Sequence, residues 1–226
     1  MIAENLQHVR SKIASVCAKA GRNPEEIILV GITKYAEADK IQEALAAGLT
    51  HIGENRVQEA ERKYAQVATP CMKHLVGHLQ SNKVNAAIQF FDLIESVDRI
   101  KIARKIDKHA GYQNKTMDIL VQVNTSGEEQ KYGVAPEELW LLLEEIHSLK
   151  HLRLQGLMTI APFTEEREII RRCFRDLKNL FDEANEKLNS KMLYLSMGMS
   201  NDYDIALEEG ANMLRIGRAI FQGVHT

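Results

Sequence analysis

A short apolar run, Ile27-Ile28-Leu29-Val30-Gly31-Ile32, follows the turn-forming pair Asn23-Pro24. A nearly continuous β-branched run of this length is typical of a strand that is buried on both faces of a parallel sheet. Parallel strands need a crossover connection, which is usually a helix. The run therefore predicts an α/β protein in which strand and helix patterns alternate along the chain.

The rest of the sequence follows this alternation. Seven further apolar runs have the length of short strands, at 51–53, 74–77, 91–94, 117–123, 152–160, 193–195 and 213–216. Helical patterns lie between them, at 38–47, 55–66, 81–88, 98–110 (ending at Gly111), 136–148, 165–188 and 201–209. Eight strand–helix units in 226 residues favour a closed (β/α)8 TIM barrel. An open, doubly wound sheet is the alternative that the pattern leaves open.

The first twenty residues predict an extra N-terminal helix ahead of the first strand. Apolar residues recur there at intervals of three and four, and Gly21 supplies a C-terminal stop. No composition shift, Ser/Gly linker or low-complexity tract divides the rest of the chain. We therefore expect one barrel domain over 1–226.

Composition excludes several classes of protein. The chain has 29 Lys+Arg against 31 Asp+Glu, a formal net charge of -2, so it is not a general binder of nucleic acids. No apolar stretch approaches the roughly 18 residues that would span a membrane. The three cysteines, Cys17, Cys71 and Cys173, form no Cys-x-x-Cys pair, and we interpret them as reduced thiols. These features predict a cytoplasmic protein, which we expect to be a monomer.

In a TIM barrel, the residues that directly follow each strand converge on one mouth, where binding sites lie. Lys34 follows the first apolar run, after Thr33. An amine at the end of a buried strand would be partly desolvated, which lowers its pKa and favours Schiff-base chemistry. The alternative is an ordinary solvated lysine.

The loops after the seventh and eighth runs indicate a phosphate site. The segment Ser196-Met197-Gly198-Met199-Ser200 leads into a helix, where the Ser200 hydroxyl and backbone N–H groups could bind an anion. Simple capping of that helix by Ser200 or Asn201 is the alternative. The neighbouring segment Arg215-Ile216-Gly217-Arg218 favours the phosphate site, because Gly217 permits close backbone approach there. A lysine facing phosphate ligands across the mouth predicts a phosphorylated aldehyde as the ligand.

The sequence resembles a known family nearly from end to end. It is similar to the pyridoxal 5'-phosphate homeostasis proteins of the YggS/PROSC type, which are related to the barrel domain of alanine racemases. Seven segments in the same order carry this resemblance, at 30–34, 53–59, 74–83, 123–128, 156–160, 195–200 and 215–217.

The resemblance implies pyridoxal 5'-phosphate as the cofactor and assigns roles to particular residues. Lys34 would hold it as an internal aldimine, and Asn55 would lie near its ring. Ser200, with backbone groups around Met199, Gly217 and Arg218, would hold the phosphate. Arg215 would face the pyridine nitrogen; without the resemblance, a surface ion pair would be its default interpretation. Arg218 stands where the family often has a small hydroxyl residue, so only its backbone N–H is expected to serve.

The leading functional hypothesis is a carrier of pyridoxal 5'-phosphate (PLP) that contributes to vitamin B6 homeostasis without strong catalytic activity. Its transient partners would be PLP-dependent apoenzymes. Racemase relatives use a tyrosine from a C-terminal β-domain as a second acid/base, and this chain ends at Thr226, directly after the eighth unit. A minimal racemase or decarboxylase is the alternative, with His78, Tyr35 or Tyr203 as proton donor. A cofactor-free Schiff-base aldolase would leave Arg215 and Ser200 unexplained.

We expect no metal site. His74 and His78 are four residues apart, a spacing that suits two metal ligands on a helix. The residues between them read as strand, however, and no third ligand is evident.

Overall fold

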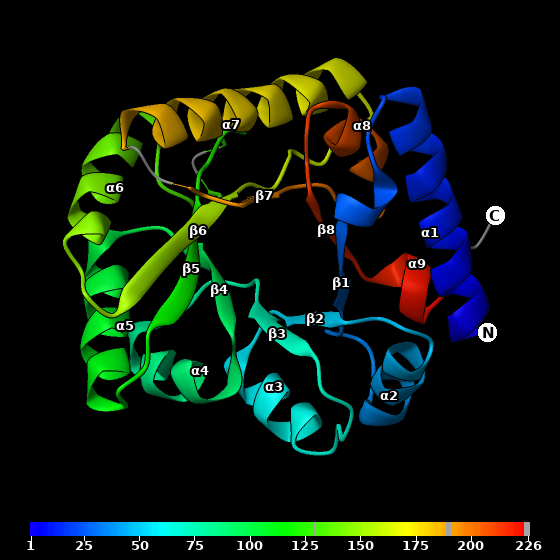
Figure 1. Cartoon of the computed structure of the whole chain (residues 1–226), viewed down its shortest axis with the longest axis horizontal. Helices are drawn as coiled ribbons and strands as arrows, with labels where there is room; N and C mark the ends of the chain where they lie inside the picture. Colours follow the sequence, from blue (N-terminus) through cyan, green and yellow to red (C-terminus); the bar gives the residue numbers. More distant parts are fainter. Residues whose placement is uncertain (129, 189–190, 224–226) are drawn as a thin grey trace.

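Eight parallel strands form a closed barrel with helices around it (Figure 1). The computed structural model describes residues 1–128, 130–188 and 191–223. The strands are β1 (Ile28–Ile32), β2 (His51–Glu54), β3 (Met72–Leu75), β4 (Leu93–Val97), β5 (Met117–Gln122), β6 (Leu152–Met158), β7 (Tyr194–Ser196) and β8 (Met213–Ile216). Strand β8 pairs with β1, with Arg215 opposite Val30. The predicted (β/α)8 barrel is therefore confirmed, and the open doubly wound sheet is excluded.

The helices alternate with the strands along the chain. They are α1 (Ile2–Lys19), α2 (Ala38–Ala46), α3 (Val57–Tyr64), α4 (Val84–Phe90), α5 (Ile100–Tyr112), α6 (Leu139–His147), α7 (Arg167–Lys187), α8 (Tyr203–Glu208) and α9 (Arg218–Phe221). Short 3-10 turns lie at η1 (Pro24–Glu26), η2 (Ser81–Lys83) and η3 (Pro136–Glu138). The predicted N-terminal helix is α1; it buries an apolar stripe, and its Asn5 Nδ2 donates to the Ile220 carbonyl of α9 at 2.9 Å.

Several predicted boundaries are wrong, among them those of β3, β4 and α5. Strand β3 begins and ends two residues earlier than predicted, and Gly77 lies beyond it, where a Cβ would be 2.2 Å from the Asn55 carbonyl oxygen. Strand β4 starts later and extends to Val97, since Phe91 still caps α4. Helix α5 continues through Gly111, and Asn114 beyond it adopts the left-handed conformation, with φ 52°.

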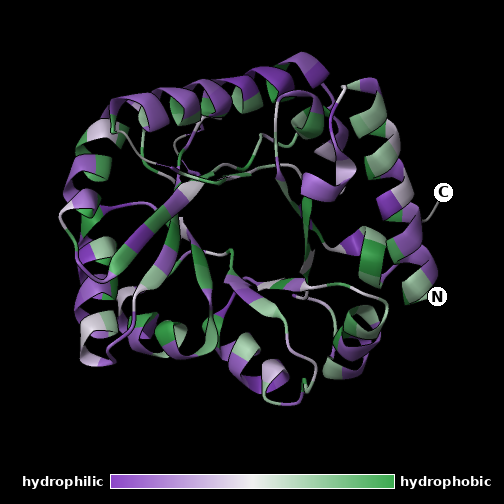
Figure 2. Cartoon of the chain, viewed as in Figure 1, coloured by the Kyte–Doolittle hydropathy of each residue, from purple (hydrophilic) through white to green (hydrophobic). Residues whose placement is uncertain are grey.

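Apolar side chains form two cores, one on each side of the strands. The larger core lies between the barrel and the helices, whose outer sides carry hydrophilic residues (Figure 2). A smaller cluster fills the barrel interior, with Val30, Leu93, Leu120, Met158 and Met213 fully or almost fully buried. Side chains alternate between these two cores along each strand, and this alternation decides which polar residues reach the inside of the barrel.

Two sequence-based interpretations can be compared directly with the structure. No helix in the described ranges is long and apolar enough to cross a membrane. All three cysteines are free thiols, and Cys17 and Cys173 are buried.

Candidate functional site

A cavity of about 490 Å³ opens at the end of the barrel where the strands terminate. We call it the barrel-mouth cavity. It is lined by residues at or just after the ends of β1, β2, β3, β6, β7 and β8, by Ile170 of α7, and by Lys131 in the loop after β5. The volume lies in the range of about 300–1,000 Å³ that is usual for small-molecule sites. All seven residues predicted as a site line this one cavity: Lys34, Asn55, Met199, Ser200, Arg215, Gly217 and Arg218.

Lys34 reaches the cavity through the alternation of β1. Ile28, Val30 and Ile32 belong to the interior cluster, and Lys34 is the next position with the same orientation. The side chain is nevertheless exposed, and its Nζ lies 5.0 Å from the centroid of the Tyr35 ring. The predicted desolvation of this amine is therefore wrong, because Lys34 lies in the turn beyond the strand, at the open mouth.

Arg215 lines the cavity from inside the barrel and is only 4% exposed. Its NH1 donates to Ser196 Oγ at 2.5 Å and its NH2 donates to the Thr159 carbonyl at 2.7 Å. A guanidinium carries five N–H donors, so these two bonds leave donors for a ligand. The alternative interpretation of Arg215 as part of a surface ion pair is excluded by this burial.

The loop after β7 is shaped by Gly198 and Asp202. Gly198 has φ 93°, a conformation that suits glycine, and its Cβ would lie 2.6 Å from Ala206 Cβ. Asp202 is the N-cap residue of α8, and its Oδ1 accepts the Met199 N–H at 2.5 Å. The capping role considered for Ser200 or Asn201 is therefore wrong, and the Met199 N–H already has an intramolecular acceptor.

Backbone N–H groups without an acceptor among the described residues lie in the loops after β7 and β8. Within the part of the chain that the structure describes, the N–H groups of Ser200, Asn201 and Gly217 have no hydrogen-bond acceptor. Gly217 also approaches β1 closely, since a Cβ there would lie 3.3 Å from the Ile32 carbonyl oxygen. Free N–H groups that line a cavity are suitable donors to an anion.

The charged residues around the cavity also favour an anion. Lys34, Lys131, Arg215 and Arg218 line it, against the single carboxyl group of Asp202. Burial raises the pKa of Asp202, although the Met199 N–H and the charge of Arg215 oppose the shift.

A second, more open cavity of about 690 Å³ lies between the loop after β5 and α7. Its charged lining is three acids, Glu137, Asp176 and Glu183, with Lys131. This cavity therefore does not suit an anion.

A buried polar network crosses the barrel interior below Arg215. We call it the inner cluster: His51, His74, Glu95, Ser196 and Arg215. His51 Nδ1 lies 2.9 Å from His74 Nε2, and His74 Nδ1 lies 2.7 Å from Glu95 Oε1. Ser196 Oγ donates to Glu95 Oε2 at 2.6 Å. Ser196 is part of the segment predicted to bind phosphate, but its hydroxyl is hydrogen-bonded to Glu95 and Arg215 inside the barrel.

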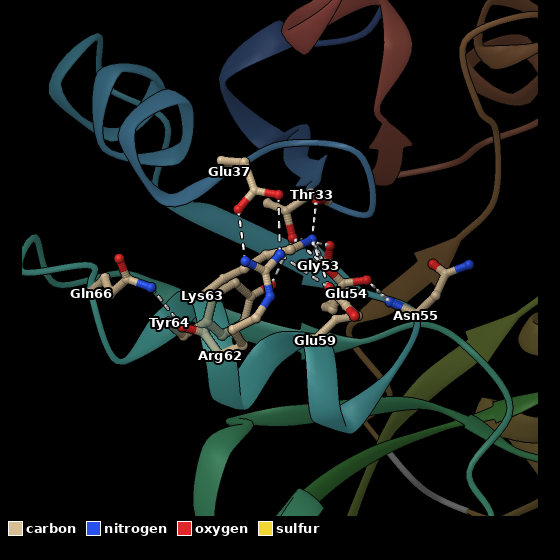
Figure 3. Close-up of polar contacts among 10 residues, drawn as sticks. All are labelled: Thr33, Glu37, Gly53, Glu54, Asn55, Glu59, Arg62, Lys63, Tyr64 and Gln66. Atoms are coloured by element: carbon tan, nitrogen blue, oxygen red, sulfur yellow. Dashed lines mark hydrogen bonds and ion pairs between the residues drawn. The ribbon is translucent and has the colours of Figure 1, made fainter.

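A second buried network, the outer cluster, lies between the barrel wall and α3: Thr33, Glu54, Lys63 and Tyr64 (Figure 3). Lys63 Nζ donates to Glu54 Oε2 at 3.0 Å and to the Thr33 carbonyl at 2.9 Å. Glu54 Oε1 accepts the Asn55 N–H at 2.7 Å. The cluster therefore ties together the ends of β1 and β2, where Lys34 and Asn55 enter the cavity.

Comparison with known proteins assigns the family. Residues 4–224 match the family model described as alanine racemase, N-terminal domain. A pyridoxal phosphate homeostasis protein from Aquifex aeolicus (strain VF5) is 41% identical over 219 residues, which cover 96% of each chain. The chain belongs to the pyridoxal phosphate homeostasis protein family.

Solved structures agree with this membership. The structure of PipY from Synechococcus elongatus PCC7942 with PLP bound has a TM-score of 0.87 and 33% sequence identity. The match covers 98% of this chain and 100% of PipY. Alanine racemase from Clostridium difficile 630 has a TM-score of 0.76 at 16% identity, covering 96% of this chain and 56% of the racemase, which shows a common fold alone.

The three residues considered as proton donors lie in different surroundings. Tyr35 is exposed and lines the barrel-mouth cavity. Tyr203 lies in α8, and burial raises its pKa. His78 stacks on Tyr132, with ring centroids 3.9 Å apart, and its Nδ1 is 3.3 Å from Asp98 Oδ2 without hydrogen-bond geometry. Only Tyr35 is therefore close to Lys34 on the cavity wall.

The two histidines considered as metal ligands contact different residues. His74 is bonded to Glu95 inside the barrel, whereas His78 stacks on Tyr132. The described residues contain no group of three or more His, Cys, Asp or Glu side chains that could hold a metal ion.

Proposed function

We propose that this chain binds pyridoxal 5'-phosphate in the barrel-mouth cavity and contributes to vitamin B6 homeostasis by buffering or delivering that cofactor. One observation carries the proposal: an amine, a buried guanidinium and unpaired backbone N–H groups line a single cavity. The family and the PLP-bound PipY structure support it. The donor set fits the cofactor, which combines an aldehyde, a ring nitrogen and a phosphate.

Each end of the cavity suits a different part of this ligand. Lys34 supplies an amine that condenses with the aldehyde and releases water. Ser200, Asn201, Gly217 and Arg218 supply N–H donors for the phosphate. The exposure of Lys34 is compatible with this role, because the amine must meet an aldehyde that arrives from solvent.

Arg215 decides how strongly the ring can act as an electron sink. When bound, the cofactor supplies a pyridine ring that accepts electrons best if its nitrogen is protonated. Arg215 donates a hydrogen bond to that nitrogen but does not give up its proton, because a guanidinium stays charged in proteins. The ring nitrogen therefore stays unprotonated, which disfavours carbanion chemistry and supports a carrier without strong catalytic activity.

The wider setting of the carrier forms part of the same proposal. We propose a cytoplasmic monomer that meets PLP-dependent apoenzymes transiently. The open mouth of the cavity supports transfer of the ligand, since Lys34 is exposed there.

Borohydride reduction followed by peptide mass mapping tests the proposal. We expect a pyridoxyl adduct on Lys34 that is lost in Lys34→Ala. Lys131→Ala is the matched control, because Lys131 lines the same cavity, and it should retain the adduct. An adduct that maps to Lys131 or to surface lysines instead would overturn the proposed role of Lys34.

The position of Tyr35 beside Lys34 on the cavity wall favours one second candidate, a minimal racemase or decarboxylase. Incubation of the loaded protein with L-alanine in deuterated water separates the two functions. The carrier predicts negligible exchange of the α-proton. Steady exchange that is abolished by Tyr35→Phe would establish the enzyme.

A further inference from the structure

The inner cluster forms a chain of hydrogen bonds whose direction is fixed at the end near the cavity. A guanidinium can only donate, so Ser196 Oγ must accept from Arg215 NH1. The Ser196 hydroxyl hydrogen is then available for Glu95 Oε2, to which it donates at 2.6 Å. Glu95 Oε1 accepts from His74 Nδ1 at 2.7 Å. Both carboxylate oxygens of Glu95 therefore accept a hydrogen bond, one from Ser196 and one from His74.

Glu95 is also the negative charge that balances Arg215. Its Oε2 lies 3.9 Å from Arg215 NH1, and both side chains are buried. Burial would raise the pKa of Glu95, but the hydrogen bond and charge of His74, the charge of Arg215 and the Ser196 hydroxyl together hold that pKa below its ordinary value. The group therefore remains a carboxylate beneath the cavity.

Stability alone does not account for an acid at position 95. The neighbouring interior residues Leu93, Met158 and Met213 are apolar. Replacing a buried ion pair by well-packed apolar residues is often neutral or stabilising. The cluster instead holds the Arg215 guanidinium through Ser196 and Glu95, while part of the guanidinium still lines the cavity.

We propose that Glu95 is a positioning residue: acting through Ser196, it orients the Arg215 guanidinium and supplies its counter-charge, so that Arg215 donates to the ring nitrogen of the bound cofactor. This inference rests on the proposed function, because it requires pyridoxal 5'-phosphate in the barrel-mouth cavity. It goes further by assigning a role to two residues that do not line that cavity.

The experiment compares two ligands that differ only at the ring nitrogen. They are pyridoxal 5'-phosphate and its 1-deaza analogue, in which a C–H group replaces that nitrogen. Both carry the same aldehyde and phosphate, so a general change in charge, fold or Lys34 reactivity alters the two dissociation constants together. Their ratio therefore reports on the contact with Arg215. The dissociation constants are measured by absorbance titration of the full chain.

We expect the unsubstituted protein to prefer pyridoxal 5'-phosphate by about tenfold, the effect of one hydrogen bond to a charged donor. Glu95→Gln should bring this ratio close to one, because a neutral amide can neither balance Arg215 nor accept at both of its atoms. Ser196→Ala should lower the ratio in the same direction. Ser96→Ala is the matched control: Ser96 is also buried on β4 but donates to the Gly77 carbonyl, at 2.6 Å, and its ratio should stay near ten.

The outcomes separate this inference from the proposed function. If the unsubstituted protein binds neither ligand, the proposed function fails and the inference fails with it. If it binds both ligands equally, or if Glu95→Gln and Ser196→Ala keep the full preference, the cofactor still binds but the positioning role is wrong. Circular dichroism checks that each variant is folded, and Ser196→Ala carries the test if Glu95→Gln does not fold.

Discussion

The inner and outer clusters each bury a carboxylate with a balancing cation, Glu95 with Arg215 and Glu54 with Lys63, yet they connect the two charges differently. In the outer cluster, Lys63 and Glu54 touch directly at 3.0 Å and are 2% and 1% exposed. In the inner cluster, Glu95 and Arg215 are 3.9 Å apart and Ser196 bridges them. The direct pair uses its donors on the protein itself, whereas the bridged pair leaves guanidinium donors for a ligand.

This difference separates a structural role from a binding role. The outer cluster lies outside the barrel, where its partners are β1, β2 and α3. The inner cluster ends at Arg215, on the wall of the barrel-mouth cavity. Substitutions in the outer cluster should therefore mainly change stability, and substitutions in the inner cluster should also change ligand recognition and pH response.

The largest expected effect comes from Lys63→Met. This change leaves the Glu54 carboxylate buried without its cation, and breaking a buried pair in this way costs about 3–5 kcal/mol. Urea titration gives the free energy of unfolding. Arg62→Met is the matched control on the same helix: Arg62 is 51% exposed in its pair with Glu37, and exposed pairs contribute about 0–1 kcal/mol. Equal losses in the two variants would contradict the structural role of the outer cluster.

The double variant Glu54→Leu with Lys63→Met sharpens the same point. Removing both charges removes the unpaired carboxylate, so the double variant should be more stable than Lys63→Met alone. It should remain below the unsubstituted protein, because the Asn55 N–H loses its acceptor on Glu54. A double variant less stable than Lys63→Met would show that the apolar replacement does not fit between the barrel and α3.

The sequence predicts the cavity better than it predicts either cluster. Lys34, Asn55, Ser200 and Gly217 each follow an apolar run, and Arg215 is the next-to-last residue of the run 213–216. Strand ends converge in any closed barrel. Their shared cavity therefore follows from strand order alone. Lys131 and Asp202 also line it and were missed, because neither directly follows a strand.

The clusters depend on features that a single sequence does not reveal. Glu95 was missed because the fourth strand was predicted to end at residue 94, whereas β4 extends to Val97 and carries Glu95 inside the barrel. Lys63 was missed because a lysine in a highly charged helix usually faces solvent. Which strands place their side chains at the same level depends on the stagger of the barrel, which local pattern does not specify.

The next largest expected effect is a loss of stability in acid, caused by residues of the inner cluster. Burial lowers the pKa of His51 to about 4, with His74 adding to the shift and Glu95 and Asp92 opposing it. The unfolded chain, with an ordinary pKa near 6.5, then binds the proton more tightly, so stability falls as the pH drops from about 6.5 toward 4. One proton gives a slope of up to about 1.4 kcal/mol per pH unit. The lowered pKa of Glu95 adds a further loss below about pH 4.3, the unfolded value.

His51→Gln tests this assignment through urea titrations at pH 7, 6 and 5. Between pH 7 and 5, the free energy of unfolding of the variant should fall less steeply than that of the unsubstituted protein. His8→Gln is the matched control, because His8 is exposed on α1, and it should keep the original slope. An unchanged slope in His51→Gln would place the acid sensitivity elsewhere.

The smallest expected effect is that of Tyr64→Phe in the outer cluster. The Tyr64 hydroxyl lies 3.1 Å from Thr33 Oγ1, and burial raises the pKa of Tyr64, so the group stays protonated. Thr33 Oγ1 keeps Glu54 Oε2 at 3.0 Å and the Gly53 carbonyl at 3.1 Å, so no buried group is left without a partner. We expect the free energy of unfolding, measured by urea titration, to fall by about 1 kcal/mol, the net value of one hydrogen bond. The preference between the two ligands should not change.

Tyr112→Phe, at an exposed tyrosine on α5, is the control and should change neither quantity. A loss in Tyr64→Phe as large as that of Lys63→Met would mean that the outer cluster acts as one cooperative network, in which the hydroxyl matters as much as the ion pair.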